Sequence, residues 1–305
     1  MVARLPWKPV EYGGNAEIPA QPLESLSKGE IPAVVIRQAY RRDDCQTLMK
    51  RLVDRELLYD PRKPVPRKFI DDAIPEGYFK EGRSRVASRA WPSATDALKR
   101  RIDIGTSLGY RGSDPEDFFA HSRSTHELFE RLFTGLPDPV EVLYNSLADV
   151  SRGKRALTAR EPDGRLYGPA IIRAHYGAYT YRPHFDSVRL REKRADYAVH
   201  SFEHQFAGVL VLQNSEHAGK TAQGLIHRCL WQPEVQPHLE NDTFYEYAKE
   251  NSIEHCQVYL DPGDLYFFNT RLIHEVPGLE SEDPRVVLAT FIGYSSGRDE
   301  MFIWS

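Results

Sequence analysis

The chain has 305 residues, of which 41% are hydrophobic, enough to build the core of one large domain or of two small ones. Its 40 basic and 44 acidic residues leave a formal net charge of −4. This near balance argues against a nucleic acid polymer or an anionic membrane surface as the main partner. No apolar run approaches the roughly 18 residues that span a bilayer, and the 3 cysteines are widely spaced without a CxxC pattern. We therefore expect a cytoplasmic protein with reduced thiols.

The first half of the chain predicts helices and loops. Prolines and glycines without periodicity indicate an irregular N-terminal arm at residues 1–30, and the run IPAVVIRQAY predicts a strand at 31–40. Asp43 and Asp44 suit a helix cap, and helical spacing of apolar residues follows at 45–58, with Leu57 on the apolar stripe, and again at 114–133 and 138–150. Residues 60–90 indicate a long loop, either a lid over a site or simply solvated. Residues 31–160 are thus expected to be mainly helical support and lid loops.

The second half of the chain has the texture of antiparallel sheets. Short β-branched or aromatic runs, separated by turn residues, include QFAGVLVLQ, QGLIHRCLW, DLYFFN, RLIHEV and RVVLATFIGYS. Helices in the first half and strands in the second predict an α+β fold. We expect a double-stranded β-helix core (jelly-roll, cupin-like) at residues 165–305, braced by the N-terminal helices within a single domain at 31–305.

One group of residues specifies a chemistry. His184 and Asp186 close a segment, PAIIRAHYGAYTYRPHFD, that is expected to be one strand, and side chains two apart on a strand share a face. His274 lies in LIHEV, directly after the apolar strand LYFFN. Two imidazoles and one carboxylate on one side of a metal leave the other side open, which is typical of non-haem Fe(II) oxygenases. We predict that these three residues bind the metal and form the catalytic centre.

Chance is the alternative explanation of this motif, because 11 histidines give several opportunities for an HxD or HxE pattern. His238 and Glu240 also fit HxE, but they lie in a polar segment, QPEVQPHLEND, that no strand pattern orients. The pair at His184 and Asp186 has an expected strand beneath it, so we favour that pair. His274 alone would be interpreted as a buried core histidine.

Arg285 supplies an independent indication. It begins the apolar strand RVVLATFIGYS, 11 residues after His274, so its guanidinium is expected to be buried. An unpaired buried charge costs several kcal/mol, and a carboxylate bound through two hydrogen bonds is the best partner for a guanidinium. That carboxylate belongs either to a bound molecule or to an Asp or Glu in a structural salt bridge.

In its order of residues, HxD, a long gap, His and then Arg, the chain resembles the Fe(II)- and 2-oxoglutarate-dependent oxygenases over roughly residues 165–305. The resemblance implies that 2-oxoglutarate chelates the metal through its 1-carboxylate and 2-keto groups, that Arg285 binds its distal carboxylate, and that O2 is the other cosubstrate. The family usually has Ser or Thr two residues after this arginine. Here that residue is Val287, so a hydroxyl contact to the cosubstrate must come from elsewhere.

The chain is also similar to the free-standing halogenases that act on indole alkaloids and related small molecules. The residues that carry this likeness are GPAIIR at 168–173, the DPR that leads into the arginine strand, and the ending RDEMFIWS. Those halogenases replace the acidic ligand with a small residue so that chloride can bind iron. This chain keeps Asp186, which favours hydroxylation.

Further candidates flank the metal motif. Arg173 and His175 precede it on the expected strand and, with Gln213 at the end of GVLVLQ, are predicted to contact the cosubstrate. The basic cluster around Arg189 and Arg191 suits an anionic substrate group, unless it is a solvated loop paired with its own acidic residues. The candidate substrate contacts are Tyr176, Arg189, Arg191 and His227.

The sequence therefore predicts an enzyme that uses Fe(II), 2-oxoglutarate and O2 to hydroxylate an unactivated C–H bond of a free small molecule, in secondary metabolism. With the same cofactors the outcome is alternatively desaturation, epoxidation, ring closure or halogenation, because substrate placement decides the fate of the substrate radical. A rival from another class is a non-oxidative metal-binding jelly-roll, either an isomerase or a binding protein. Such a protein would not need Arg285 beside its metal.

Overall fold

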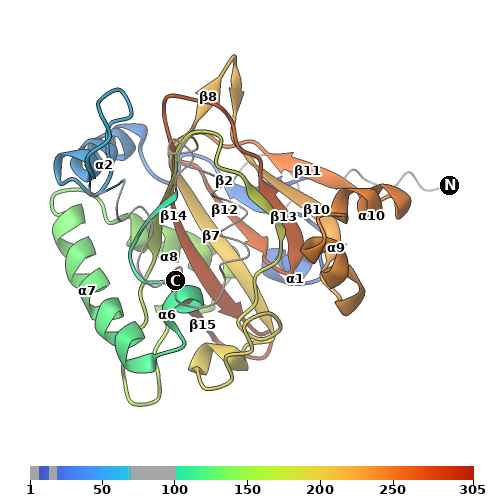
Figure 1. The fold of residues 1–305 in the computed structure, drawn as a ribbon. Coiled ribbons are helices and arrows are strands. Elements are labelled where there is room, and N and C mark those ends of the chain that lie inside the picture. Colours follow the sequence, from blue (N-terminus) through green and yellow to red (C-terminus); the bar gives the residue numbers. More distant parts are fainter. Residues whose placement is uncertain (1–6, 14–18, 68, 70–100) are drawn as a thin grey trace.

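The computed structural model describes residues 7–13, 19–67, 69 and 101–305 (Figure 1). Two sheets dominate it. The major sheet follows the order β1-β2-β12-β7-β14-β15-β4, and β14 also pairs with β5, which pairs with β3. Its strands are Val10–Glu11 (β1), Val34–Ile36 (β2), Arg101–Ile104 (β3), Arg155–Thr158 (β4), Ile171–His175 (β5), His204–Gln213 (β7), Leu265–Asn269 (β12), Arg285–Tyr294 (β14) and Glu300–Trp304 (β15).

The minor sheet follows the order β11-β10-β13-β6, and its three pairings are all antiparallel. Its strands are Tyr181–His184 (β6), Gly224–Leu230 (β10), His255–Val258 (β11) and Leu272–Val276 (β13). A small hairpin joins Glu216–His217 (β8) to Lys220–Thr221 (β9). The strands confirm the predicted α+β fold with a jelly-roll core.

The helices cover the outer faces of the sheets. Figure 1 shows α2 and α7 on one side of the major sheet and α9 and α10 beside the minor sheet. The helices are Pro22–Ser27 (α1), Arg42–Asp54 (α2), Leu108–Arg111 (α6), Pro115–Phe133 (α7), Pro139–Ser151 (α8), Gln236–Glu240 (α9) and Phe244–Glu250 (α10), with 3-10 turns at Ala198–Ser201 and Pro233–Val235. None of the helices that the structure describes is long and apolar enough to cross a membrane.

Alternation along the central strand β7 divides the core into two layers. Phe206 and Leu210 pack in the cluster formed with the apolar stripes of α2, α7 and α8. Ala207 and Val209, on the opposite face of the strand, pack in the cluster that includes Ile226 of the minor sheet. A strand buried on both faces reads as a continuous apolar run, which is why GVLVLQ shows no polar alternation.

The structure corrects several expected boundaries. The arm at residues 1–30 is not wholly irregular, because β1 pairs with β2 and α1 packs near β12 and α8. Helix α2 begins at Arg42, so Asp43 and Asp44 lie in its first turn and not at the cap position. Their carboxylates still interact favourably with the positive end of the helix dipole. It ends at Asp54, so Leu57 lies beyond the helix. Most of the loop expected at 60–90 lies outside the described residues.

The segment expected to be one strand before His184 is two strands in different sheets. β5 lies in the major sheet and β6 in the minor sheet, and residues 176–180 turn between them. Gly177 in this turn has a φ of +59°, in the left-handed region that glycine adopts without strain. This crossing carries His184 from one sheet to the other, opposite the strand that bears His274.

Candidate metal centre and cavity

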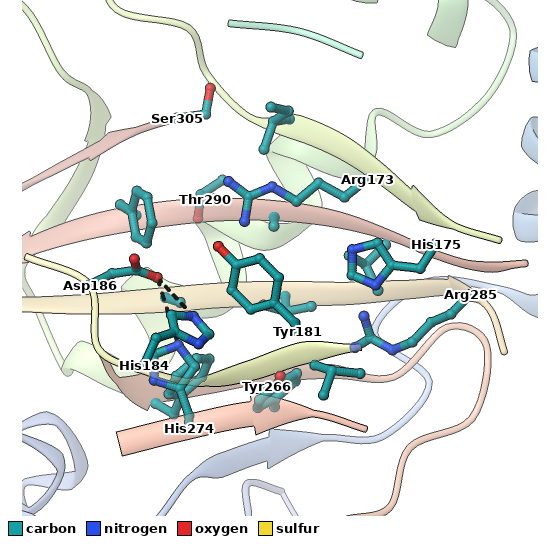
Figure 2. A pocket seen from close by; sticks show the side chains of 18 residues that line it. Arg173, His175, Tyr181, His184, Asp186, Tyr266, His274, Arg285, Thr290 and Ser305 are labelled. Carbon is teal, nitrogen blue, oxygen red and sulfur yellow. Dashed lines mark ion pairs between the residues drawn. The ribbon is translucent and has the colours of Figure 1, made fainter. Parts of the chain in front are cut away.

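Two adjacent strands of the minor sheet bring the predicted ligands together. His184 ends β6 and is paired in register with His274 of β13. Asp186 Oδ2 lies 3.6 Å from His184 Nε2 and 3.7 Å from His274 Nε2. One ligand atom from each of the three residues lies within 4.8 Å of the other two. Figure 2 shows the three side chains gathered at one end of a cavity.

Backbone carbonyls fix the tautomers of both histidines. His184 Nδ1 lies 2.6 Å from the carbonyl oxygen of Arg182, and His274 Nδ1 lies 2.8 Å from that of Leu272. A carbonyl oxygen only accepts, so Nδ1 carries the hydrogen in each ring and Nε2 keeps its lone pair. Nε2 of His184 is buried and has no hydrogen-bond partner. Both Nε2 atoms are therefore free to bind a cation beside Asp186.

Asp186 is held in place by its backbone and by Arg191. Its N–H donates to the carbonyl of Thr270 over 2.9 Å, and Thr270 Oγ1 donates to its carbonyl over 2.8 Å. Arg191 Nη1 donates to Asp186 Oδ1 over 2.9 Å and to the carbonyl of Phe185 over 2.7 Å. Since Arg191 occupies Oδ1, the second oxygen, Oδ2, is the one directed at the two imidazoles.

The charge states at this point suit a divalent cation. Burial, and then the neighbouring His274, lower the pKa of His184 to about 4, so its ring is neutral at pH 7. Burial alone would raise the pKa of Asp186, but His184, His274 and Arg191 hold it well below its usual value. Two imidazoles and one carboxylate are the donor set of non-haem iron. The residues present therefore fit Fe(II).

The cavity lies between the sheets and has mostly apolar walls. It extends from the three ligands towards the strands β5 and β14 (Figure 2). Tyr181 stands edge-on against His184, with ring centroids 4.1 Å apart. Aliphatic and aromatic residues form most of the remaining wall: Ile171, Ala207, Val209, Phe268, Val276, Val287, Ala289 and Phe291.

A buried cation stands at the far end of the cavity. Arg285 is 4% exposed, and its Nε has no hydrogen-bond partner. Burial lowers the pKa of Arg285, and the nearby Tyr266 hydroxyl offsets part of this lowering. The Tyr266 hydroxyl has room because the facing residue of β10 is Gly224, where a Cβ atom would lie 3.1 Å from its oxygen. No carboxylate of the described residues forms a salt bridge with Arg285 within 4.0 Å, which disfavours the structural salt bridge.

His175 is the neighbour of Arg285 in register across β5 and β14, and it also lines the cavity. Burial first, and then Arg285, Arg101 and Arg173, hold its pKa well below the ordinary value. Neither ring nitrogen has a hydrogen-bond partner among the residues that the structure describes. This neutral ring therefore offers one donor and one acceptor to a molecule bound beside Arg285.

Three predicted contacts lie elsewhere. Gln213 Nε2 donates to the carbonyl of Pro284 over 3.0 Å. Tyr176, on the opposite side of β5 from His175, stacks on Tyr59 with centroids 4.0 Å apart. His227 faces outward from β10, where its Nε2 lies 2.9 Å from Glu275 Oε1. None of the three lines the cavity.

The basic cluster is divided by the structure. Arg191 binds Asp186, whereas Arg189 is exposed and does not line the cavity. The competing HxE pair lies on the short helix α9, where His238 Nδ1 contacts Thr243 Oγ1 at 3.0 Å. Sequence reasoning missed Tyr266 and Tyr181, since an aromatic residue on a strand is indistinguishable from a core residue until the sheet register is known.

A jelly-roll with this donor set and a buried arginine at the far end of its cavity is the architecture of an Fe(II)- and 2-oxoglutarate-dependent oxygenase. The family model described as "Carrier-protein-independent halogenase WelO5" matches residues 16–305, and the chain belongs to this family. This confirms both the predicted resemblance and the cofactors, iron and 2-oxoglutarate. It also argues against the rival interpretation of the chain as a non-oxidative isomerase or binding protein.

No curated protein sequence matches the chain. Among solved structures, an N-substituted L-amino acid dioxygenase from Burkholderia ambifaria AMMD, in complex with alpha-ketoglutarate, is 14% identical with a TM-score of 0.48, covering 93% of this chain and 90% of that one. HygX from Streptomyces hygroscopicus, with nickel and 2-oxoglutarate bound, is 13% identical with a TM-score of 0.46, covering 92% and 89%. The epimerase SnoN from nogalamycin biosynthesis is 12% identical with a TM-score of 0.40, covering 90% and 84%.

Proposed function

We propose that this oxygenase hydroxylates an unactivated C–H bond of a free small molecule. One oxygen atom of O2 enters the C–H bond and the other enters succinate, while 2-oxoglutarate loses its 1-carboxylate as CO2. The observation that carries the proposal is Asp186, whose Oδ2 lies 3.6 and 3.7 Å from the two imidazole nitrogens. A carboxylate there takes the coordination position that a halogenase leaves to chloride.

In this proposal the chain's own residues position the reactants. His184, Asp186 and His274 hold the metal, which together with 2-oxoglutarate supplies the activation of O2. Arg285 binds the distal carboxylate of 2-oxoglutarate, and the Tyr266 hydroxyl supplies the contact that Val287 cannot make. Neutral His175 lies beside this carboxylate without adding a further charge. The apolar walls keep water from the reacting carbon.

Halogenation is the second candidate, favoured by the description of the matching family as halogenases. Chloride would have to displace Asp186 from the metal. The main-chain bonds to Thr270 fix the Asp186 backbone, and the carboxylate accepts a hydrogen bond from Arg191 through Oδ1, so turning the side chain away from the metal would break that bond. This network supports hydroxylation over halogenation in the wild-type chain.

The family description also supports a free substrate rather than one tethered to a carrier protein. We further propose that residues 31–305 act as one oxygenase domain. The residues that line the cavity come from several strands, from β5 to β14, and from Ser305. Removing the segment that contains Ser305 would therefore remove part of the cavity wall.

The decisive experiment reconstitutes the protein with Fe(II) and 2-oxoglutarate without oxygen. A weak metal-to-ligand charge-transfer band in the visible is expected, and its absence from protein loaded with iron would contradict the assignment. Oxygen is then admitted with a panel of amino acids, nucleotides and alkaloid-like compounds, in chloride-containing and chloride-free buffer. Succinate release with a product heavier by one oxygen atom in both buffers supports hydroxylation, and a chlorinated product supports halogenation.

A further inference from the structure

A second guanidinium faces the cavity beside the proposed cosubstrate site. Arg173 lies two residues before His175 on β5, so both side chains project from the same face of the strand. Across β14, Arg285 pairs with His175 and Val287 pairs with Arg173. Arg173 is therefore displaced from Arg285 by two residues along the sheet, roughly 7 Å. The cavity holds two separate cationic positions, both visible in Figure 2.

The carboxylate nearest to Arg173 is already engaged. Arg101 Nε donates to Asp103 Oδ1 over 2.8 Å, and its Nη2 donates to Asp103 Oδ2 over 2.6 Å. Arg173 Nε lies 3.9 Å from Asp103 Oδ1, outside hydrogen-bonding distance. One carboxylate thus faces two guanidiniums, and a positive charge remains at Arg173.

Loading the site with metal and cosubstrate does not neutralise this charge. Fe(II) and the dianion of 2-oxoglutarate cancel each other, and Asp186, the one carboxylate side chain in the described cavity wall, is paired with Arg191. The Arg173 side chain is 17% exposed, and its Nε is buried without a hydrogen-bond partner. A cation so removed from water requires an anion, and Asp103, the carboxylate paired with Arg173 among the described residues, is shared with Arg101.

We propose that Arg173 binds a carboxylate of the substrate, so that the substrates are hydrophobic monocarboxylates. The inference rests on the proposed function and names the substrate class of the same site. A single planar guanidinium matches one carboxylate in shape and charge. The wall beside it is apolar, with Ile171 and Val287 among its residues, and suits a hydrocarbon part extending towards the metal. Arg173 thereby recognises the substrate, whereas the sequence had suggested a contact to the cosubstrate.

The test uses the full-length protein with Fe(II) and 2-oxoglutarate under anaerobic conditions. Matched probes differ in charge alone: indole-3-acetate with indole-3-acetamide, and N-acetyl-L-leucine with its amide. Binding is followed by the change that each probe causes in the visible charge-transfer band. We expect each acid to bind at least tenfold more tightly than its amide. Arg173→Met should abolish this preference and Arg173→Lys should retain part of it, while the affinity for 2-oxoglutarate stays within twofold.

Arg189→Met is the matched control, because Arg189 is the exposed arginine of the basic loop, and it should leave the preference intact. Equal binding of acids and amides, no binding of any acid, or a preference that survives in Arg173→Met would overturn the inference. So would a loss of 2-oxoglutarate affinity in Arg173→Met, since Arg173 would then belong to the cosubstrate site. Absence of the band in the wild type overturns the proposed function itself, which separates the two failures.

Discussion

Replacing Arg285 with methionine tests the cosubstrate site most directly. The side chain is 4% exposed, and its Nε has no partner, so an incoming carboxylate would find a desolvated cation with free donors. Removing one member of such a buried charge pair costs about 3 to 5 kcal/mol. At about 1.4 kcal/mol for each factor of ten, the dissociation constant of 2-oxoglutarate should rise by two to three and a half orders of magnitude.

The same variant should have the opposite effect on the protein without cosubstrate. Burial of a guanidinium without a carboxylate partner is unfavourable and lowers the pKa of Arg285, whereas methionine of similar length carries no charge. We therefore expect Arg285→Met to unfold at the same or a higher denaturant concentration than the wild type. Added 2-oxoglutarate should stabilise the wild type against unfolding and leave the variant unchanged.

The assay is an anaerobic titration of the Fe(II) protein with 2-oxoglutarate, followed by the visible charge-transfer band. Arg189→Met serves as the control for loss of a positive charge, because that residue is exposed and outside the cavity. A dissociation constant for Arg285→Met within threefold of the wild-type value would refute the assignment. Equal weakening in both variants would point to overall charge instead of a specific contact.

Four further predictions concern the same cavity. Tyr266→Phe should weaken 2-oxoglutarate binding about threefold to tenfold, the value of one hydrogen bond, in the same titration. Asp186→Ala should abolish tight Fe(II) binding in equilibrium dialysis, and Arg191→Met should weaken it about 10- to 100-fold, as loss of an outer-shell partner does, while Arg189→Met leaves it unchanged. Because burial and three arginines hold the pKa of His175 well below 6.5, the unfolded chain binds more protons than the folded one below that pH. The stability contributed by His175 is therefore full above pH 6.5 and falls by up to about 1.4 kcal/mol per pH unit below it, and His175→Asn should flatten this dependence in urea denaturation.

The metal motif could be found in the sequence because its geometry is local. His184 and Asp186 are two residues apart at the end of β6, and Arg285 stands at the start of a strand too apolar to leave it in water. Spacing and hydrophobicity carry this information without knowledge of the sheets. The resemblance then supplied the cosubstrate, and the family match confirmed it.

Residues whose role depends on which face of a strand they occupy could not be found in this way. His227 follows Ile226, which faces the core between the sheets, so His227 points outward. Phe244 of α10 covers the outer face of β10, with its ring edge-on to His227. Both faces of the strand are therefore covered, and the sequence does not show which face borders the cavity. Tyr176 was misplaced for the same reason, since helices cover the other side of β5. Side-chain direction on a strand buried on both faces is decided by register, which one sequence does not contain.

Long-range pairing hid the remaining contacts. Tyr266 reaches Arg285 although the two strands that carry them are not neighbours, since β7 lies between β12 and β14. Arg101 and Asp103 come from β3, about 70 residues before Arg173, and reach Arg173 only because β3 adds to the edge of the sheet beside β5. Local patterns do not encode such neighbours.

The two histidine ligands are oriented by main-chain carbonyls and the Asp186 ligand by a side chain, and this difference affects which ligand can be exchanged by mutation. Each imidazole is fixed by a carbonyl two residues earlier on its own strand, and a main-chain carbonyl survives most substitutions. The Asp186 carboxylate depends instead on the side chain of Arg191 in the following loop. Evolution can therefore alter the acidic ligand and its support within residues 186–191 and keep both histidines in place.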